Sequence, residues 1–529
     1  MTGMNSIGDL LDQCVDRHRD LPALIWGYGD GRRVMSFGEL GAASARLAGG
    51  LIARGVRRGD AVLVLQSMSP NLYLVLIALF RMGAVALFPD PQALRPTISA
   101  ACRQFRPKAV IGAPAAHALR LVMPELRCVP VHVSTGIALP LTPSIAALSN
   151  GATASPSVCT PPESPALITF TSGSTGAPKA VPRSHLLLLN QHAAMRAHMP
   201  LEAGSTCLVT LPVLVLSNLL EGVTSILPSS DVRKPGSVDP GPLLAQIGEN
   251  DAQAMIVSPA LLERLVMAGE PESTNLAHVK QIFTGGGPVF PDLIESIGLR
   301  APQARLHIAY GSSEAEPVAH IVADEISEED RASMAAGGGL LAGRPVPPVR
   351  IAIVRTGHDG PQPDVTLSAF EGLRCAPGER GEICVTGDHV VKTYADPAQN
   401  VETKIRVDGQ IWHRTGDAGY LDDQGRLWLS GRWNARIPHD GDWLYPFEVE
   451  AVARNFLSRR RLACVEIAGR PALAVQGKMD FGTQRLLEGA LHPLGVGKIV
   501  TLRRLPMDRR HNSKIDYPAL QRHLAWKHG

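Results

Sequence analysis

The segment that most constrains this chain is Thr169-Phe-Thr-Ser-Gly-Ser-Thr-Gly-Ala-Pro-Lys-Ala-Val-Pro-Arg-Ser-His185. Every residue between Thr171 and Thr175 is Gly, Ser or Thr, so the backbone can bend tightly and offer amide and hydroxyl donors to phosphate oxygens. Lys179 adds a positive charge nearby. A strand-like apolar run precedes the segment, and Ser184 is a good helix N-cap residue at its end. The pattern predicts a phosphate-binding loop between a strand and a helix.

The spacing of glycine and lysine excludes a Walker A loop. That motif needs four residues between its glycines and a lysine directly after the second. Here Gly173 and Gly176 are three positions apart, and Lys179 lies three further on. P-loop kinases and GTPases are therefore excluded. A Ser/Gly-rich linker would fit the composition, but it does not require the Pro178-Lys179 pair or the flanking apolar elements.

Length and composition describe a packed globular protein with more than one domain. The chain has 529 residues, of which 45% are hydrophobic and 19% charged. A net charge of +3 without a long basic block argues against a nucleic-acid partner. The eight cysteines show neither a Cys-x-x-Cys pair nor metal-ligand spacing. We therefore expect buried free thiols in a reducing compartment.

We expect a cytoplasmic location without a transmembrane segment. The N-terminus carries an early acidic residue, Asp9, and lacks the apolar stretch of a signal peptide. The longest apolar run, residues 72–88, is interrupted by Arg81. This run fits a buried helix followed by a strand better than a membrane span.

Apolar runs alternate with helix signals through the first half of the chain. Ser36 and Glu39 have capping-box spacing and open a predicted helix. The other predicted elements are a hairpin around residues 28–32, a helix at 69–82, and strands at 59–66, 84–88 and 109–112. This alternation predicts doubly wound α/β layers.

Two segments rich in turn residues interrupt the pattern. Residues 136–164 are predicted as an exposed loop, and residues 327–343 as a second flexible segment. From residue 346 the apolar runs become shorter and alternate, which predicts a β-rich subdomain.

Three further motifs carry polar groups at expected turns. Tyr310-Gly-Ser-Ser-Glu314 offers an aromatic face for a purine and a carboxylate for Mg²⁺, although alone it fits a surface turn equally well. Thr284-Gly-Gly-Gly-Pro288 fits a tight turn. The segments 413–420 and 425–432 contain Asp417, whose carboxylate is able to accept two hydroxyl hydrogen bonds, and a structural Asp at the turn of a hairpin is the alternative.

Together these motifs resemble those of the adenylate-forming superfamily of acyl-CoA synthetases, peptide-synthetase adenylation domains and luciferases. The resemblance covers about residues 15–525. It implies an AMP-forming ligase that uses ATP and Mg²⁺ to activate a small carboxylic acid as its acyl-adenylate. It also implies an N-terminal domain, residues 1–431, of two doubly wound α/β subdomains and a β-rich subdomain, followed by a small mobile α+β C-terminal domain, residues 432–529.

The resemblance assigns roles to the residues at matching positions. Catalytic roles fall to Lys514, in Arg509-Arg-His-Asn-Ser-Lys-Ile-Asp516, and to Glu314 and Lys179; magnesium would be held near Glu314 and Thr171. The acyl pocket would include Gly285 and the aliphatic Val213, Leu214 and Val215, which core packing explains equally well. The nucleotide would be bound by Thr171, Ser172, Gly173, Ser174, Thr175, Gly176, Gly286, Gly287, Tyr310, Gly311, Ser313, Asp417 and Arg432.

The sequence departs from the common family pattern after the expected domain boundary. Trp433 and Asn434 stand where Asp or Lys is common, which leaves rotation of the C-terminal domain open. Residues 437–443 lack the paired glycines of members that ligate CoA. CoA is therefore a less favoured co-substrate.

Several stretches are most similar to the olefin-pathway β-lactone synthetases, above all Arg510-His-Asn-Ser-Lys-Ile515. In that branch the β-hydroxyl of a long-chain β-hydroxy acid attacks its own adenylate and expels AMP. This predicts β-lactone formation without CoA and, as partners, other enzymes of the same pathway. A fatty acyl-CoA ligase or acyl-AMP ligase remains an alternative, as does an inactive carboxylate- or nucleotide-binding relative.

Overall fold

The computed structural model describes residues 6–89, 95–172, 178–268, 276–355, 364–507 and 515–528. The chain divides into two compact units. Unit 1 comprises Met1–Ser229, Ala245–Ile256 and Thr393–Asn400, and unit 2 comprises Ser230–Leu244, Val257–Lys392 and Val401–Gly529. The domain boundary at residues 431 and 432 stays a prediction.

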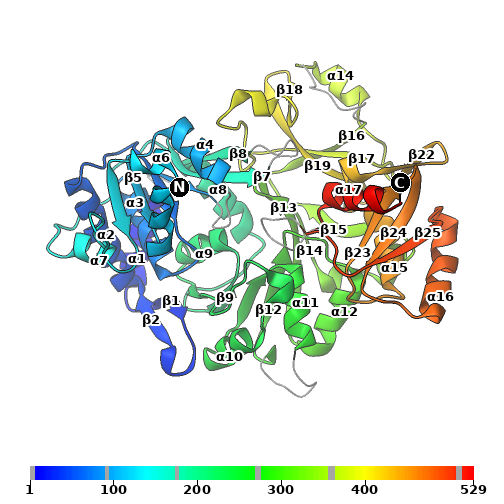
Figure 1. Cartoon of the computed structure of the whole chain (residues 1–529), viewed down its shortest axis with the longest axis horizontal. Coiled ribbons are helices and arrows are strands. Elements are labelled where there is room, and N and C mark those ends of the chain that lie inside the picture. The colour runs from blue at the N-terminus through cyan, green and yellow to red at the C-terminus, as the bar shows by residue number, and fades with distance from the viewer. Residues whose placement is uncertain are drawn as a thin grey trace. The chain divides into compact units, whose positions relative to one another are not determined.

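Unit 1 contains a six-stranded sheet in the order β6-β5-β3-β4-β7-β8. Its strands pair in parallel except for β7 and β8, which form an antiparallel pair. Figure 1 shows this sheet in blue to cyan among the first helices of the chain. The bounds are β3 (Ala61–Leu65), β4 (Val85–Phe88), β5 (Ala109–Gly112), β6 (Val131–Ser134), β7 (Pro165–Ser172) and β8 (Pro178–Ser184).

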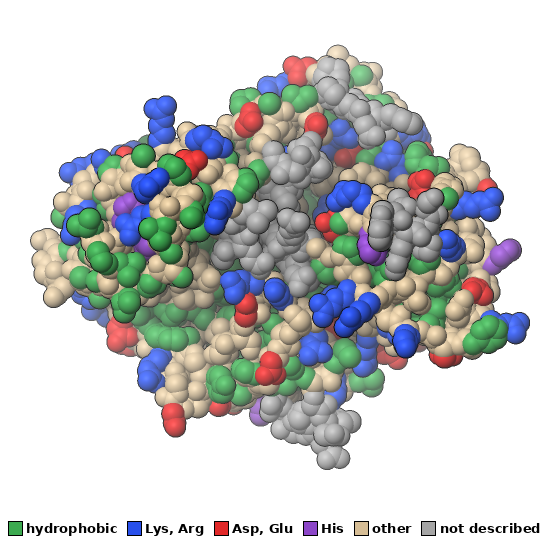
Figure 2. Space-filling model, in the orientation of Figure 1, with side chains coloured by type: hydrophobic (Ala, Val, Ile, Leu, Met, Phe, Trp, Pro, Cys, Tyr) green, Lys and Arg blue, Asp and Glu red, His purple; other side chains and the backbone are tan. Residues whose placement is uncertain are grey.

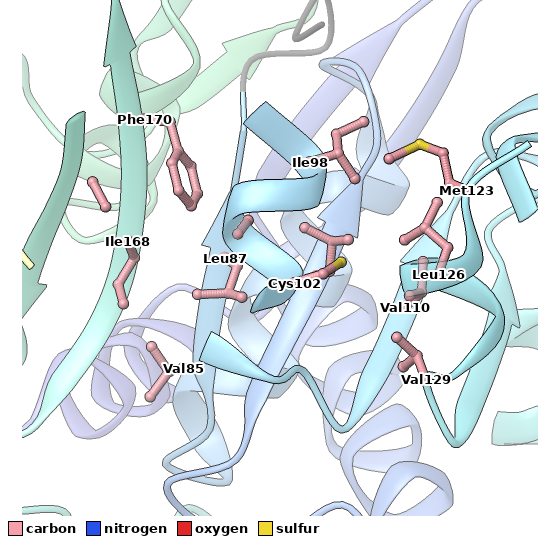
Figure 3. Packing of buried hydrophobic residues seen from close by; sticks show 13 residues of the cluster. Val85, Leu87, Ile98, Cys102, Val110, Met123, Leu126, Val129, Ile168 and Phe170 are labelled. Carbon is pink, nitrogen blue, oxygen red and sulfur yellow. The ribbon is translucent and has the colours of Figure 1, made fainter. Parts of the chain in front are cut away.

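The helix α4 (Arg95–Phe105) packs on this sheet through Ile98 and Cys102. In Figure 3 these side chains point toward Leu87 and Val110 of the strands below. The same buried cluster contains Ile168 and Phe170 of β7. The strand that leads into the predicted phosphate loop is therefore anchored in the core of unit 1.

A second group of unit 1 strands has the order β11-β9-β10-β1-β2. The first four run in parallel, whereas β1 and β2 form the predicted hairpin around the short helix Gly29–Gly31. The bounds are β1 (Pro22–Trp26), β2 (Arg33–Ser36), β9 (Thr206–Val209), β10 (Thr224–Ile226) and β11 (Ala254–Val257).

The helix starts follow the predicted capping signals. Ser36 and Glu39 form a reciprocal capping box at the start of α2, and the Ser184 side chain caps α8. The apolar run at 72–88 forms a helix followed by a strand, as predicted. Besides α4, the described helices up to residue 249 are α1 (Ile7–Arg17), α2 (Phe37–Ala53), α3 (Pro70–Arg81), α5 (Pro114–His117), α6 (Pro124–Arg127), α7 (Ile145–Ser149), α8 (His185–Arg196), α9 (Pro212–Leu219) and α10 (Gly241–Glu249).

Unit 2 carries the predicted β-rich region. Its strands follow the order β12-β13-β14-β15-β20-β19-β17-β16, and β18 pairs with β19. Only the β12–β13 pair among those described is parallel. The bounds are β12 (Gln281–Gly285), β13 (Arg305–Ser312), β14 (Ala315–Val322), β15 (Leu340–Pro345), β16 (Arg350–Val354), β17 (Gly381–Thr386), β18 (Lys404–Val407), β19 (Gln410–Leu421) and β20 (Leu427–Arg432). The helices of this region are α11 (Pro259–Met267), α12 (Pro291–Arg300), α13 (Glu328–Ala335) and α14 (Leu367–Gly372).

The residues after β20 form an α+β module, which we call the C-terminal module. Alternate residues of β23 point to opposite faces, so Leu462 and Cys464 pack with α15 and α16, while Ala463 and Val465 pack with α17. The module contains β21 (Ile437–His439), β22 (Asp442–Leu444), α15 (Pro446–Arg454), β23 (Leu462–Ile467), β24 (Arg470–Gln476), α16 (Phe481–Leu491), β25 (Lys498–Leu502) and α17 (Tyr517–His528).

Three expectations need correction. Residues 327–343 are not one flexible segment, because Ser327 caps α13 and residues from 340 form β15. The loop at 136–164 contains the short helix α7. Cys128 and Cys159 are exposed, although Cys14, Cys102, Cys207, Cys384 and Cys464 are buried free thiols.

Within the described part of the chain, no helix is both long enough and apolar enough to cross a membrane. On the face shown in Figure 2, side chains of both charge signs are spread over the surface. This distribution agrees with the small net charge of +3.

Candidate active site

In unit 1, the predicted site residues that the structure describes on the β7–β8 hairpin are Thr171, Ser172 and Lys179. Thr171 of β7 lies opposite Lys179 of β8, and Ser172 lies opposite Pro178. Lys179 was predicted as part of a loop, but it lies on a strand and only 6% of its surface is exposed. Residues 173–176, which carry the predicted phosphate-binding glycines and hydroxyls, lie outside the described residues.

Lys179 is held by a segment that is distant in sequence. Its Nζ lies 5.5 Å from the centroid of the Tyr394 ring, a cation–π distance. The N–H of Ala395 donates to the Ala180 carbonyl at 3.0 Å, and the Gln399 amide donates to the Pro178 carbonyl at 3.3 Å. Both hydrogen bonds join β8 to the segment Thr393–Asn400. Local sequence patterns did not indicate Tyr394 as a neighbour of Lys179, because the two residues are more than 200 positions apart.

The predicted acyl-pocket residues of unit 1 lie on α9. Leu214 and Val215 are buried, and Val213 is half-buried. The helix is anchored by the Tyr73 hydroxyl, which donates to the Pro212 carbonyl at 3.2 Å, and by a 2.9 Å contact between His192 Nδ1 and the Ser217 hydroxyl. The burial of Leu214 and Val215 matches core packing, and their role toward a substrate stays a prediction.

Unit 2 contains a cavity of about 260 Å³. Its walls come from the loop after β12, the end of β13, strands β15, β19 and β20, and the C-terminal module. Several predicted nucleotide-binding residues meet on this cavity: Gly286, Gly287, Tyr310, Gly311, Asp417 and Arg432.

Asp417 is the centre of a polar trio on the cavity wall. Its Oδ2 accepts the Tyr310 hydroxyl at 2.9 Å, and its Oδ1 lies 3.1 Å from Arg432 Nη1. The arginine is its direct cross-strand neighbour, because β19 and β20 pair with Asp417 opposite Arg432. The Thr415 hydroxyl accepts the Asp417 N–H at 3.1 Å and donates to the Ile383 carbonyl at 2.9 Å.

This trio can still bind a ligand. Each carboxylate oxygen accepts more than one hydrogen bond, so Asp417 keeps acceptor capacity for the two hydroxyls of a ribose. Burial, first, and the Asp417 carboxylate, second, raise the pKa of Tyr310 well above its ordinary value. The Asp417 carboxylate also raises the pKa of Arg432. Tyr310 therefore stays a neutral donor, and Arg432 stays a cation.

Gly286 and Gly285 were both predicted as site residues, but the structure explains a glycine at each position in a different way. Gly286 has φ +76°, and a Cβ there would meet no atom within 4 Å, so this backbone faces open space at the cavity wall. At Gly285 a Cβ would lie 2.4 Å from the Ala309 carbonyl oxygen of the paired strand β13. Close strand packing therefore explains Gly285, and it does not line the cavity described here.

Ser313 and Glu314 form the turn between β13 and β14. The Glu314 carbonyl accepts the N–H of Val391 at 2.8 Å, and its N–H donates to the Ser312 hydroxyl at 3.3 Å. The Glu314 carboxylate contributes to raising the pKa of Arg432, so it lies within electrostatic range of the trio. A single carboxylate fits Mg²⁺, which is commonly bound by one or two carboxylates together with phosphate oxygens and water.

The C-terminal module closes the cavity with groups that sequence reasoning did not single out. Glu450, Arg454, Arg461 and Tyr517 line it, and the Tyr517 hydroxyl donates to Glu450 Oε1 at 2.7 Å. Lys514 lies outside the described residues. Only the motif around Lys514 pointed to this region, because none of the four side chains has a recognisable local pattern.

Comparisons with known proteins agree with this geometry. A family model described as AMP-binding enzyme matches residues 11–395. An olefin β-lactone synthetase of Stenotrophomonas maltophilia is 32% identical over 503 residues, which cover 91% of this chain and 89% of that protein. The olefin β-lactone synthetase of Xanthomonas campestris pv. campestris is 30% identical over 508 residues, with the same coverage of 91% and 89%. A 2-succinylbenzoate–CoA ligase of Enterococcus faecalis is 28% identical over 416 residues, or 78% of this chain and 74% of the ligase.

Solved structures share the fold. ATP-bound MatB of Rhodopseudomonas palustris has a TM-score of 0.79 at 20% identity and covers 99% of this chain and 100% of its own. The O-succinylbenzoate coenzyme A synthetase of Bacillus subtilis, in complex with ATP and magnesium, has a TM-score of 0.75 at 22% identity and covers 97% and 98%. These likenesses confirm the predicted α/β fold class. By its sequence, the chain belongs to the AMP-binding enzyme family and is an adenylate-forming, AMP-forming ligase.

Proposed function

We propose that this enzyme activates a long-chain β-hydroxy acid as its acyl-adenylate and then closes it to a β-lactone. The adenylation step is supported above all by the Tyr310–Asp417–Arg432 trio on a cavity. The lactone step is supported by 32% identity over 91% of the chain to an olefin β-lactone synthetase.

In the first half-reaction, a carboxylate oxygen of the acid attacks the α-phosphorus of ATP. The bond from that phosphorus to pyrophosphate breaks, and pyrophosphate leaves with the electron pair. Asp417 and Tyr310 would hold the nucleoside, with the ribose hydroxyls on the Asp417 carboxylate. Thr171, Ser172 and residues 173–176 would contact the phosphates.

Charge moves from the carboxylate to the phosphates during this step. Lys179 and Lys514 would stabilise the transition state more than the ground state, because a positioned ammonium interacts best with the charge that develops there. Glu314 and Thr171 would hold Mg²⁺, which when bound neutralises the leaving pyrophosphate. Residues 432–529 would act as a lid domain that carries Lys514.

In the second half-reaction, the β-hydroxyl oxygen attacks the acyl carbon of the adenylate. The bond from that carbon to the AMP oxygen breaks, AMP leaves, and the hydroxyl proton passes to a base or to solvent. The product is the starting acid less one water. No CoA enters this step, because the acceptor belongs to the substrate.

Mass spectrometry of the products tests this proposal. The protein is incubated with a β-hydroxy fatty acid, ATP and Mg²⁺, with and without CoA. We expect a product lighter than the acid by one water in both tubes. Lys514→Ala should reduce its rate by about 100-fold or more, the effect of losing one donor to a transition-state charge.

Two other outcomes would redirect the proposal. A thioester that forms only with CoA would identify an acyl-CoA ligase, an alternative favoured by the 28% identity to the 2-succinylbenzoate–CoA ligase. Absence of both products and of ATP–pyrophosphate exchange with any tested acid would point to an inactive carboxylate- or nucleotide-binding relative.

A further inference from the structure

A buried carboxylate on the cavity wall has no role in the reaction outlined above. Glu450 of α15 is 4% exposed and lines the cavity. Its Oε1 accepts the Tyr517 hydroxyl at 2.7 Å and the Cys464 N–H at 3.0 Å. Burying a carboxylate is costly, and a well-packed apolar side chain often stabilises a fold as well or better. The position of Glu450 therefore calls for an explanation beyond packing.

Tyr517 links this carboxylate to the nucleotide-binding trio. Its ring lines the same cavity, and its proximity to Arg432 contributes to raising the pKa of that arginine. Arg432 pairs with Asp417, which accepts the Tyr310 hydroxyl. Polar groups thus line the cavity from Glu450 of α15 to Tyr310 at the end of β13, and Tyr517 lies within electrostatic range of Arg432 between them.

Residues 515–517 are fixed to the cavity wall from several sides. Ile515 forms a β-bridge with Met507, and both line the cavity. The N–H of Asp516 donates to the Pro506 carbonyl at 3.0 Å. Tyr517 begins α17, whose Leu520 and Leu524 are fully buried against the module's sheet. The Glu450–Tyr517 hydrogen bond is the contact that ties this assembly to α15.

We propose that Glu450 and Tyr517 are positioning residues for adenylation, whose hydrogen bond holds residues 515–517 on the cavity wall directly after Lys514 in the chain. This inference rests on the proposed function, because it assumes that Lys514 acts in the adenylation step. It gives the buried carboxylate a role that a purely apolar contact would not fill, since the bond sets direction as well as distance.

The geometry also makes the positioning sensitive to pH. Burial raises the pKa of Glu450 to about 7, while hydrogen bonds and a nearby cation act in the opposite direction. An ionised carboxylate accepts a hydrogen bond about twice as strongly as a neutral group. The bond should therefore tighten as the pH rises through 7. The charged or titratable groups that face this carboxylate or its direct partners are Tyr517 of α17, Cys464 of β23, Arg454 and Glu448 of α15, and Arg432 of β20.

ATP–pyrophosphate exchange with a long-chain β-hydroxy fatty acid tests the proposal on the full chain. We expect Tyr517→Phe and Glu450→Gln to lower the kcat of exchange by about tenfold, the effect of one charge-assisted hydrogen bond, with the KM for ATP nearly unchanged. The unmodified protein should show a rise in kcat with an inflection near pH 7, and Glu450→Gln should remove that inflection.

The matched control is Glu448→Gln on the same helix. Glu448 is also buried, but it pairs with Arg380 and does not line the cavity. We expect this control to keep the kcat and its pH inflection. Circular dichroism confirms that each variant is folded. Unchanged kcat and pH profile in both folded test variants would overturn the proposal.

A readout without substrate separates this inference from the proposed function. If no acid supports exchange in the unmodified protein, the proposed function fails, and the positioning is tested by tryptic cleavage at Arg509, Arg510 and Lys514. Several-fold faster cleavage in Tyr517→Phe than in the unmodified protein and in Glu448→Gln would support the positioning. Equal rates in all three proteins would overturn it.

Discussion

At the scale of single residues, the cavity is organised by carboxylates whose surroundings give them different properties. Asp417 lies beside a cation and a phenol hydroxyl, and it serves as an acceptor. Glu450 has neutral hydrogen-bond donors and deep burial, and its pKa rises to about 7. Desolvation disfavours the charged form of a carboxyl group, and this effect dominates at Glu450. The neighbours, more than the residue type, therefore determine what each carboxylate does.

Substitution of Asp417 by Asn should weaken nucleotide binding. The change keeps the shape but removes the charge that pairs with Arg432, and it replaces one of the two acceptor oxygens proposed for the ribose by an NH₂ donor. A hydrogen bond to a charged group is worth about 1.5–3 kcal/mol, so we expect the KM for ATP in pyrophosphate exchange to rise by about 10- to 150-fold.

Asp422→Asn is the matched control for this prediction. Asp422 lies just after the same strand and pairs with Arg426 at 2.8 Å, but it does not line the cavity. We expect the KM for ATP of this variant to stay within about twofold of the unmodified value, because the substitution removes no contact proposed for the nucleotide. Equal effects of the two substitutions would contradict the role given to Asp417.

The raised pKa of Glu450 lowers the free energy of unfolding as the pH rises from 4.5 to about 7. Below its ordinary pKa of 4.5, the carboxyl is protonated in both the folded and the unfolded state. Between pH 4.5 and about 7 the unfolded state loses its proton while the folded state retains it, so rising pH favours unfolding. Well above pH 7 the decrease in the free energy of unfolding is complete and amounts to about 3 kcal/mol.

Chemical denaturation of the unmodified protein and Glu450→Gln at pH 4.5, 6 and 8 measures this contribution. The difference in the free energy of unfolding between the two proteins cancels the titration of other groups. We expect Glu450→Gln to gain stability relative to the unmodified protein as the pH rises to 8. A difference that stays constant with pH would show that Glu450 titrates normally.

At the scale of secondary-structure elements, β7 of unit 1 and α15 of unit 2 are each anchored by apolar packing next to predicted or proposed functional residues. Ile168 and Phe170 hold β7 in the core of unit 1, directly before Thr171 and Ser172. In the C-terminal module, Val449 and Val452 hold α15 against the module's sheet while Glu450 reaches the cavity. Apolar packing thus fixes the backbone of each element next to these residues.

Truncation of Ile168 to Ala should destabilise unit 1. The side chain is 5% exposed within a closed apolar cluster, so its loss leaves a cavity that costs about 2–5 kcal/mol. Thermal unfolding should begin several degrees lower. Leu141→Ala is the control, because Leu141 is 98% exposed and its truncation should leave the unfolding temperature unchanged. Similar shifts in both variants would argue against the anchoring role of β7.

At the segment after β20, aromatic packing replaces the residues common in the family. Trp433 is nearly buried, and the Arg436 guanidinium lies 4.0 Å from its ring centroid and 4.3 Å from that of Trp443. The stacked arginine joins the short helix at residues 433–435 to strand β22. Sequence comparison located this departure, whereas the stacking that accompanies it depends on contacts across the module.

At the scale of the whole molecule, the chain is organised as two units, and each contains some of the residues predicted for adenylation. Unit 1 contains the β7–β8 hairpin with Lys179, and unit 2 contains the cavity with Asp417. The chain passes between the units several times, so neither unit is one continuous stretch. The segment Thr393–Asn400 illustrates the consequence, since it lies in unit 1 and supports Lys179 although its sequence neighbours belong to unit 2.

Local patterns in the sequence predict the types of element, the chemistry of the motifs and the family. Helix caps such as Ser36 and Ser184, the strand leading to Thr171, and the hairpin near residue 30 depend on neighbours within a few positions, so local patterns predict them. The same reasoning failed at residues 327–343, where glycine-rich composition concealed α13 and β15. There the pairing of β15 with β14 and β20 overrides local preference.

Which side chains meet depends on the folded arrangement of the strands and helices. Tyr310, Asp417 and Arg432 come together because β13, β19 and β20 belong to one set of paired strands in a particular register. Tyr394 reaches Lys179, and Tyr517 reaches Glu450, across long separations in the chain. Strand order and register depend on long-range pairing and on packing of the whole core, and local periodicity does not encode them. For that reason the motifs indicated adenylation chemistry, whereas the support of Lys179 and the carboxylate behind Tyr517 became visible only in the folded chain.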